Sequence, residues 1–253
     1  MFKPRPRAFP LPTSPLKIFE APEIVGDPKL KIIDWSPQCN PFVQNSKLAL
    51  ALQDQVFLID HLSGQNKVLL TLSDDMPGKY VASINFDRSG EALAVGTSDR
   101  QVQIYDVERQ KQVRKITGSL ARVSALSWNK SILAPYLLSA SGPDTLIVNH
   151  DVRMRRSAIN VLEKHGCEVT GLEWSANCSY EQMRQSDAAS IYLSSTSVQG
   201  DLAVWRLSEI TFGHDHTLRP CLYDKESFGS PLNAVAWNPN NEGVFAVGGS
   251  EGD

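Results

Sequence analysis

Cysteine is scarce in this sequence, and its few thiols are widely spaced. The chain of 253 residues has four cysteines, Cys39, Cys167, Cys178 and Cys221. Disulfide frameworks and structural zinc sites both need clustered ligands at short spacings. We therefore expect four reduced thiols, with neither a disulfide framework nor a metal site.

The sequence also lacks a charge excess and a long apolar run. It contains 25 basic and 28 acidic residues, for a net charge of -3, which gives no sign of a nucleic-acid or membrane partner. Residues 1–15 are basic and Pro-rich without the apolar stretch of a secretory signal. No apolar segment approaches the roughly 20 residues of a membrane span. We expect a soluble protein of the cytoplasm and nucleus.

Catalytic motifs are missing as well. The sequence has no phosphate-cradling loop with its lysine, and no Gly-x-Ser-x-Gly turn. The closest pair of histidines, His214 and His216, falls in a long polar loop, whereas a zinc site needs about four converging ligands. We expect no catalytic residue, no metal and no cofactor, so an enzyme is the least favoured class.

Proline is concentrated at the amino terminus. Residues 1–28 contain seven of the fifteen prolines and predict an extended lead-in, with one short candidate strand at residues 16–20. Residues 29–253 instead predict short alternating strands separated by polar turns. One candidate helix, residues 180–186, falls in an insertion.

A repeated pattern dominates residues 29–253. An apolar segment that ends in an aromatic residue recurs five times, at residues 30–35, 81–86, 123–128, 169–174 and 232–237. A second strand rich in Ala, Ser and Gly follows each, at residues 48–52, 92–97, 136–141, 191–195 and 244–249. A third strand follows in four repeats, at residues 56–60, 102–106, 146–151 and 202–205.

The spacing of this pattern predicts an all-β fold, a WD-repeat β-propeller. The aromatic residues are 51, 42, 46 and 63 positions apart, close to the roughly 40–45 residues of a WD blade. Small residues in the second strand suit packing near the axis, and the aromatic residue fills the space between neighbouring sheets. We expect a truncated propeller, with about four complete blades and part of a fifth out of about seven. A partial gene product and a truncated isoform both remain open.

One side-chain network of WD repeats looks incomplete. His165 matches the histidine that in many WD repeats hydrogen-bonds an aspartate six residues before the closing aromatic. That position is Gln199 in the same blade, whereas Asp99 and Asp144 occupy it in blades two and three. Blade three has Ser119 in place of the histidine. We expect no complete network and a less rigid propeller.

Several motifs in order resemble the Fizzy and Fizzy-related proteins, the substrate-recruiting activators of the anaphase-promoting complex, a ubiquitin ligase. They are the Ala-Pro segment before blade one, Asp-Trp-Ser, Ala-Arg-Val and His-Asp-Val-Arg, at residues 21–22, 34–36, 121–123 and 150–153. The resemblance covers roughly residues 13–253 and is weakest in blade four. Its divergence is similar to that of a specialised member, such as the insect meiotic activator.

The resemblance implies two binding residues for degradation motifs. Asp34 matches the acidic residue that meets the arginine of the destruction box, in a groove between blade one and the last blade. A carboxylate can accept a bidentate bond from a guanidinium, although Asp34 could instead cap a turn between blades. Tyr80 matches a tyrosine that takes part in binding the Lys-Glu-Asn motif, and could equally be a half-buried ring at a blade corner.

The resemblance also implies a function. We expect a substrate-recognition adaptor of the anaphase-promoting complex, with ligase subunits and degradation-motif substrates as partners. Residues 1–13 contain no recognisable ligase-docking box, and Val198-Gln-Gly200 replaces the Asn-rich turn of blade four. The alternative is therefore a WD-repeat interaction scaffold that has lost ligase engagement.

Overall fold

The structure is a computed structural model that describes most of the chain from residue 13 onwards. The described residues are 13–15, 18, 20–22, 24, 26–37, 47–60, 63–72, 78–175, 191–206, 223–225, 228–238 and 243–251. The candidate helix at 180–186 and the pair His214 and His216 lie outside them, as do residues 16, 17 and 19 of the candidate strand.

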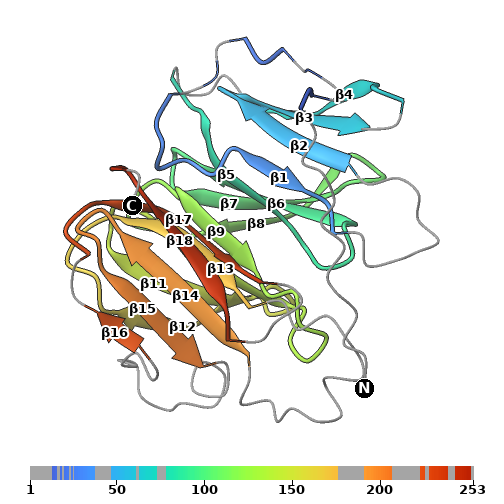
Figure 1. Cartoon of the computed structure of the whole chain (residues 1–253). Coiled ribbons are helices and arrows are strands. Elements are labelled where there is room, and N and C mark those ends of the chain that lie inside the picture. The colour runs from blue at the N-terminus through green and yellow to red at the C-terminus, as the bar shows by residue number, and fades with distance from the viewer. Residues whose placement is uncertain are drawn as a thin grey trace, which may run out of the picture.

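Five antiparallel sheets make up the described chain, and within each sheet neighbouring strands follow one another in sequence (Figure 1). Blade one contains β1 (Ile33–Trp35), β2 (Lys47–Leu52), β3 (Gln55–Asp60) and β4 (Asn66–Thr71). Blade two contains β5 (Val81–Phe86), β6 (Ala92–Thr97), β7 (Gln101–Asp106) and β8 (Lys111–Thr117). Blade three contains β9 (Ala125–Trp128), β10 (Leu137–Ser141), β11 (Leu146–Asp151) and β12 (Ala158–Glu163).

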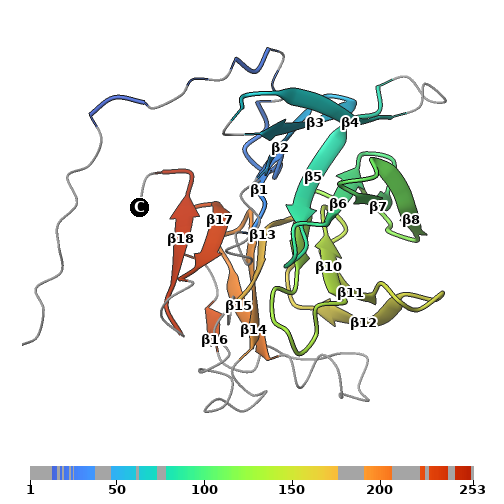
Figure 2. The same cartoon turned by 90° about the vertical axis from the view of Figure 1, so that its right-hand side faces the viewer.

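Blade four contains β13 (Val169–Trp174), β14 (Tyr192–Ser197), β15 (Leu202–Arg206) and β16 (Tyr223–Lys225), and blade five contains β17 (Leu232–Trp237) and β18 (Phe245–Gly249). The first strands of successive blades contact one another around a common centre, from which the sheets radiate (Figure 2). The predicted all-β propeller is confirmed. The described residues contain no α-helix, and so no helix that could cross a membrane.

The strands nearest the axis are the first strands of the blades, and the expectation that small-residue second strands pack there was wrong. Each second strand lies one position further out. The small residues of the second strand instead leave room for a hydrogen bond to the next blade. Gly96 in β6 has no Cβ, which leaves room for the Ser83 hydroxyl of β5 to donate to the Val123 carbonyl at 2.6 Å.

The hydrophobic core is divided into layers between neighbouring blades. One buried cluster joins blades one and two around Phe86, a second joins blades two and three around Trp128, and a third joins blades three and four around Trp174. The aromatic residue at the end of each of these first strands therefore fills the space between two sheets, as the sequence predicted. Burial of these layers supplies the main driving force that holds one blade on the next.

Blade four contains the tryptophan, serine and histidine hydrogen bonds of a WD network, but its histidine and aspartate lie beyond hydrogen-bond distance, so the expectation of an incomplete network is not contradicted. Trp205 Nε1 donates to Ser195 Oγ at 3.1 Å, and His165 Nε2 lies 2.7 Å from the same hydroxyl. His165 Nδ1 lies 4.0 Å from Asp201 Oδ2. Asp201 thus comes four residues before the closing aromatic residue, whereas Gln199 occupies the position six residues before it.

Candidate peptide-recognition sites

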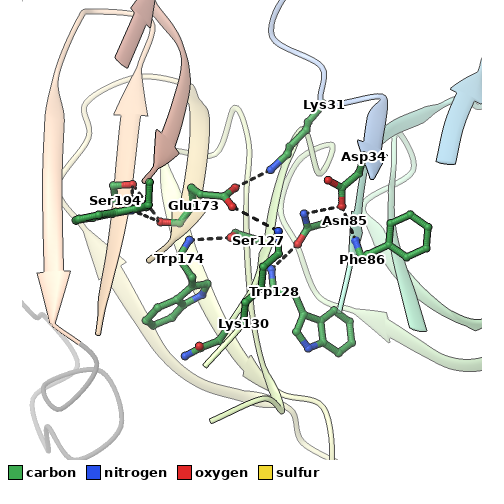
Figure 3. Close-up of polar contacts among 12 residues, drawn as sticks. Lys31, Asp34, Asn85, Phe86, Ser127, Trp128, Lys130, Glu173, Trp174 and Ser194 are labelled. Atoms are coloured by element: carbon green, nitrogen blue, oxygen red, sulfur yellow. Dashed lines mark hydrogen bonds and ion pairs between the residues drawn. The ribbon is translucent and has the colours of Figure 1, made fainter. Parts of the chain in front are cut away.

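A repeated hydrogen bond joins the ends of the first strands in blades one to four. The residue before each aromatic offers a side-chain oxygen to the backbone N–H of the next blade's aromatic residue. The three bonds run from Phe86 N to Asp34 Oδ2 at 2.7 Å, from Trp128 N to Asn85 Oδ1 at 2.7 Å, and from Trp174 N to Ser127 Oγ at 3.0 Å (Figure 3). We call these three bonds the inter-blade rungs. Asp34 is thus the first member of a structural series.

The two carboxylate oxygens of Asp34 differ in their contacts. Oδ2 accepts from Phe86 N and also from Asn85 Nδ2, at 3.0 Å. Oδ1 accepts no hydrogen bond from any residue that the structure describes. Burial raises the pKa of Asp34, and the nearby ammonium groups of Lys31 and Lys130 only partly oppose that rise. Asp34 can therefore hold blade two through one oxygen and still present the other to a ligand.

Asp34 points towards blade two, whereas the resemblance implies a groove on the opposite side of blade one. Its neighbours Ile33 and Trp35 alternate to that opposite side, where their side chains are 55% and 44% exposed. The structure thus places apolar surface, and not the carboxylate, on the side away from blade two. The role of Asp34 in binding an arginine stays a prediction.

Close to the rungs, a glutamate near the axis binds two lysines from other blades. Glu173 in β13 lies 2.8 Å from Lys31 Nζ, next to blade one, and 3.7 Å from Lys130 Nζ, between β9 and β10 of blade three (Figure 3). Burial alone would raise the pKa of Glu173, but the attraction of both lysines outweighs burial and lowers it. The axis thus contains an ionised pair between blades one and four.

Tyr80 belongs to a second polar cluster, at the other end of the first strands. Arg122 Nη1 donates to Tyr80 Oη at 3.1 Å, and Arg122 Nη2 lies 2.8 Å from Glu168 and 3.4 Å from Asp27. Lys29 Nζ lies 2.9 Å from the other oxygen of Glu168. We call these five residues the Tyr80 cluster. It joins the segment before blade one to blades two, three and four.

Ionisation stabilises this cluster. Burial opposes the charge on Glu168, but hydrogen bonds from Arg122 and Lys29 prevail and lower the pKa of the carboxyl. Burial would likewise lower the pKa of Arg122, and its bonds to Glu168 and Tyr80 instead raise it. The guanidinium and the carboxylate therefore stay charged at neutral pH, which makes their hydrogen bonds the stronger, charge-assisted kind.

The structure does not bring the two predicted binding residues together. Tyr80 precedes β5 and the Asp34 rung meets its last residue, Phe86, so about 20 Å of extended strand separates them. Sequence reasoning also missed Arg122 and Glu168. A signal was present, because both directly precede an apolar repeat, as Tyr80 does.

Comparison with known proteins identifies the family. A family profile described as the anaphase-promoting complex subunit 4 WD40 domain matches residues 35–131. "Meiotic fizzy-related protein 1" of Schizosaccharomyces pombe is 30% identical over 247 residues, which cover 98% of this chain and 49% of that protein. "Cell division cycle 20.5, cofactor of APC complex" of Arabidopsis thaliana is 31% identical over 250 residues, with coverages of 98% and 49%.

A solved structure agrees. The chain superposes on one from the "Crystal Structure of Mitotic Checkpoint Complex" with a TM-score of 0.76 and 30% identity, over 98% of this chain and 65% of that one. The chain belongs to the Fizzy and Fizzy-related family. This Fizzy-family chain spans about half the length of the curated relatives it matches. Its sequence identity extends beyond one blade, because the alignments cover nearly all of it.

Proposed function

We propose that this Fizzy-family chain is a substrate-recognition adaptor of the anaphase-promoting complex, and that it binds degradation motifs of cell-cycle proteins without catalysing a reaction. The observation that carries the proposal is the match of 98% of the chain to a relative named as a cofactor of that complex. The proposal places the protein in the cytoplasm and nucleus. It includes neither a nucleic-acid nor a membrane partner, in keeping with a net charge of -3.

The two polar clusters support peptide recognition. Asp34 retains an oxygen without an acceptor role among the described contacts, and exposed apolar side chains flank it on β1. The carboxylate and the apolar side chains face opposite sides of β1, so they offer a peptide two separate features, an acceptor for an arginine and a surface for an apolar residue. The Tyr80 cluster offers a second set of ordered polar groups at the other end of the strands.

Affinity purification of the protein from dividing cells tests the proposal. We expect subunits of the anaphase-promoting complex among the recovered proteins. Their absence, together with recovery of other stable partners, would support the WD-repeat scaffold without ligase engagement. Purification of a relative named as a cofactor of the complex, from the same cells, provides the positive control.

The peptide role of Asp34 is tested by removing its charge while keeping its hydrogen bond to Phe86 N. Asp34→Asn keeps an oxygen for Phe86 N and removes the charge that would attract a guanidinium. We expect Asp34→Asn to weaken the binding of a destruction-box peptide by roughly tenfold, as for loss of one charge-assisted hydrogen bond. Its melting temperature should stay close to that of the unchanged protein. Unchanged affinity would remove Asp34 from the binding site.

A further inference from the structure

We propose that the loop between β9 and β10 is a preformed binding element, and that its Ile132 and Leu133 side chains insert into an apolar pocket with an acidic rim on a partner protein. We call residues 129–136 the β9–β10 loop. The inference goes beyond the proposed function, because it needs no degradation motif. It applies to an adaptor and to a scaffold alike.

The first step is that the β9–β10 loop exposes two neighbouring apolar side chains. Ile132 and Leu133 are 39% and 48% exposed. The residues on either side of this pair, Ser131 and Ala134, are buried. The corresponding turn of blade two, residues 87–91 with the sequence DRSGE, contains no apolar side chain. A blade can therefore make this connection without exposed apolar surface, so the pair in blade three is not needed to close the turn.

The second step is that hydrogen bonds hold the β9–β10 loop in one conformation. Asn129 Oδ1 accepts from Ser131 N at 2.8 Å, and Ser131 Oγ accepts from Leu133 N at 3.2 Å. Trp128 Nε1 donates to the Pro135 carbonyl at 2.7 Å. Because these bonds fix the backbone on both sides of the exposed pair, the pair loses little conformational entropy when it binds a partner.

Contacts with both neighbouring blades fix the β9–β10 loop on the propeller. Arg88 Nη1 of blade two donates to the Lys130 carbonyl. Lys130 Nζ lies 3.7 Å from Glu173 Oε1 in blade four (Figure 3). Ala134 belongs to the buried cluster between blades three and four. The exposed pair is therefore presented from a base that three blades hold in place.

The third step is that the charge beside the exposed pair indicates the chemistry of the partner. The turn between β11 and β12, residues 152–157, lies at the same end of blade three, and Val152 N donates to the Tyr136 carbonyl at 3.0 Å. This turn has no acidic residue and exposes three arginines, Arg153, Arg155 and Arg156. Asp151 pairs with one of them, so positive charge stays in excess. An acidic rim around an apolar pocket complements such a surface.

The first part of the test identifies what contacts the β9–β10 loop. Benzoylphenylalanine in place of Leu133, in the full chain expressed in dividing cells, cross-links on illumination to the peptide that lies against it, which mass spectrometry identifies. The same replacement of Val68, which is 47% exposed on β4, is the matched control. We expect a partner peptide that cross-links at Leu133 and not at Val68, from a surface with apolar and acidic side chains.

The second part measures the affinity of the purified, cross-linked partner for the chain. The double variant Ile132→Ser/Leu133→Ser should bind it roughly tenfold more weakly, because the apolar area is lost, while Val68→Ser should bind unchanged. Arg155→Glu/Arg156→Glu should weaken binding most at low salt, because it reverses the charge beside an acidic rim. The melting temperatures should stay close to that of the unchanged protein, since all these side chains are exposed.

A third variant tests whether the loop is preformed. Ser131→Ala keeps both apolar side chains but loses the hydrogen bond to Leu133 N. It should bind the partner severalfold more weakly, because the loop must then be ordered on binding. Unchanged affinity would show that the order of the loop does not contribute.

Three results would overturn the inference. They are the absence of a cross-link at Leu133, a cross-link only to a second copy of this chain, and a partner that binds Ile132→Ser/Leu133→Ser as tightly as the unchanged protein. Equal weakening by Val68→Ser would overturn it too, because the loop would then have no special role. None of these results bears on the proposed function, which depends on recovery of the ligase subunits.

Discussion

At the scale of the residue, Asp34 shows how one side chain can belong to a structural series and still differ from it. Asn85 and Ser127 form the same rung with neutral oxygens. Asp34 brings a charge that the rung does not need, and burial raises its pKa. A charge that costs free energy and is not required for packing is a reasonable place to look for ligand binding.

The rung itself predicts a loss of stability. In Asp34→Ala the Phe86 N–H loses its acceptor, so we expect the free energy of unfolding to fall by about 1–3 kcal/mol. Asp34→Asn should lose less, because its amide oxygen can still accept. Urea denaturation of both variants measures the difference. Ser127→Ala provides the comparison from blade three, and equal stability of all three variants with the unchanged protein would show that the rungs contribute nothing.

At the scale of the element, the sequence predicted the inner strands well and missed the outer ones. The predicted bounds of β5, β13 and β17 agree with the structure, because each ends at an aromatic residue that fills an inter-blade layer. The strand expected at 30–35 begins only at Ile33. No fourth strand was predicted. The fourth strand of a blade lies at the edge of its sheet and pairs on one side only. In β8, with the sequence KQVRKIT, charged side chains protect this edge from pairing with another chain, and apolar residues alternate little.

The residues of the candidate sites, too, could be predicted from the sequence only in part. Tyr80 could be chosen from its motif, yet its partner Arg122 depends on how two blades are placed side by side, which strand periodicity does not contain. The direction in which the Asp34 side chain points likewise depends on how the blades are placed side by side. Alternation along β1 fixes that Asp34 and Trp35 face opposite sides, but only the packing of blade two on blade one shows which side each faces.

Close packing between a second strand and the next blade gives a prediction for β6. A Cβ at Gly96 would overlap Ser83 Oγ and lie 2.5 Å from the Val123 carbonyl oxygen. Gly96→Ala should therefore break the hydrogen bond between them and lower the free energy of unfolding by roughly 1–3 kcal/mol. Gly26→Ala is the control, since nothing lies within 4 Å of its Cβ position. Equal melting temperatures for the two variants would contradict the packing argument.

At the scale of the whole molecule, the two polar clusters lie at opposite ends of the same inner strands. The Asp34 rung is at the end of β1, and the Tyr80 cluster is at the beginnings of the first strands of blades two, three and four. About 20 Å of strand lies between them. Two motifs of one substrate could therefore bind the propeller together only if a linker of comparable reach joined them. The spacing between the two motifs in the substrate then matters as well as the motifs themselves.

The pair between Lys31 and Glu173 links blade one to blade four across the axis and supplies the last prediction. Their side chains are 32% and 16% exposed, so the pair falls between a surface and a buried ion pair. Removal of one partner, as in Lys31→Met or Glu173→Gln, should lower the free energy of unfolding by about 1–3 kcal/mol at neutral pH. The double variant should lose less than the sum of the two.

The pH dependence follows from the lowered pKa of Glu173. A carboxyl whose pKa is lower in the folded state stabilises the fold above its ordinary value of 4.5, and this stability is lost as the pH falls through the folded pKa. Glu173→Gln should therefore destabilise the protein at neutral pH and lose that effect in acid. Urea denaturation of the unchanged protein and of Glu173→Gln, from neutral to acid pH, measures the difference in the free energy of unfolding. A gap in stability that stays constant down to acid pH would show that Glu173 acts through packing and not through its charge.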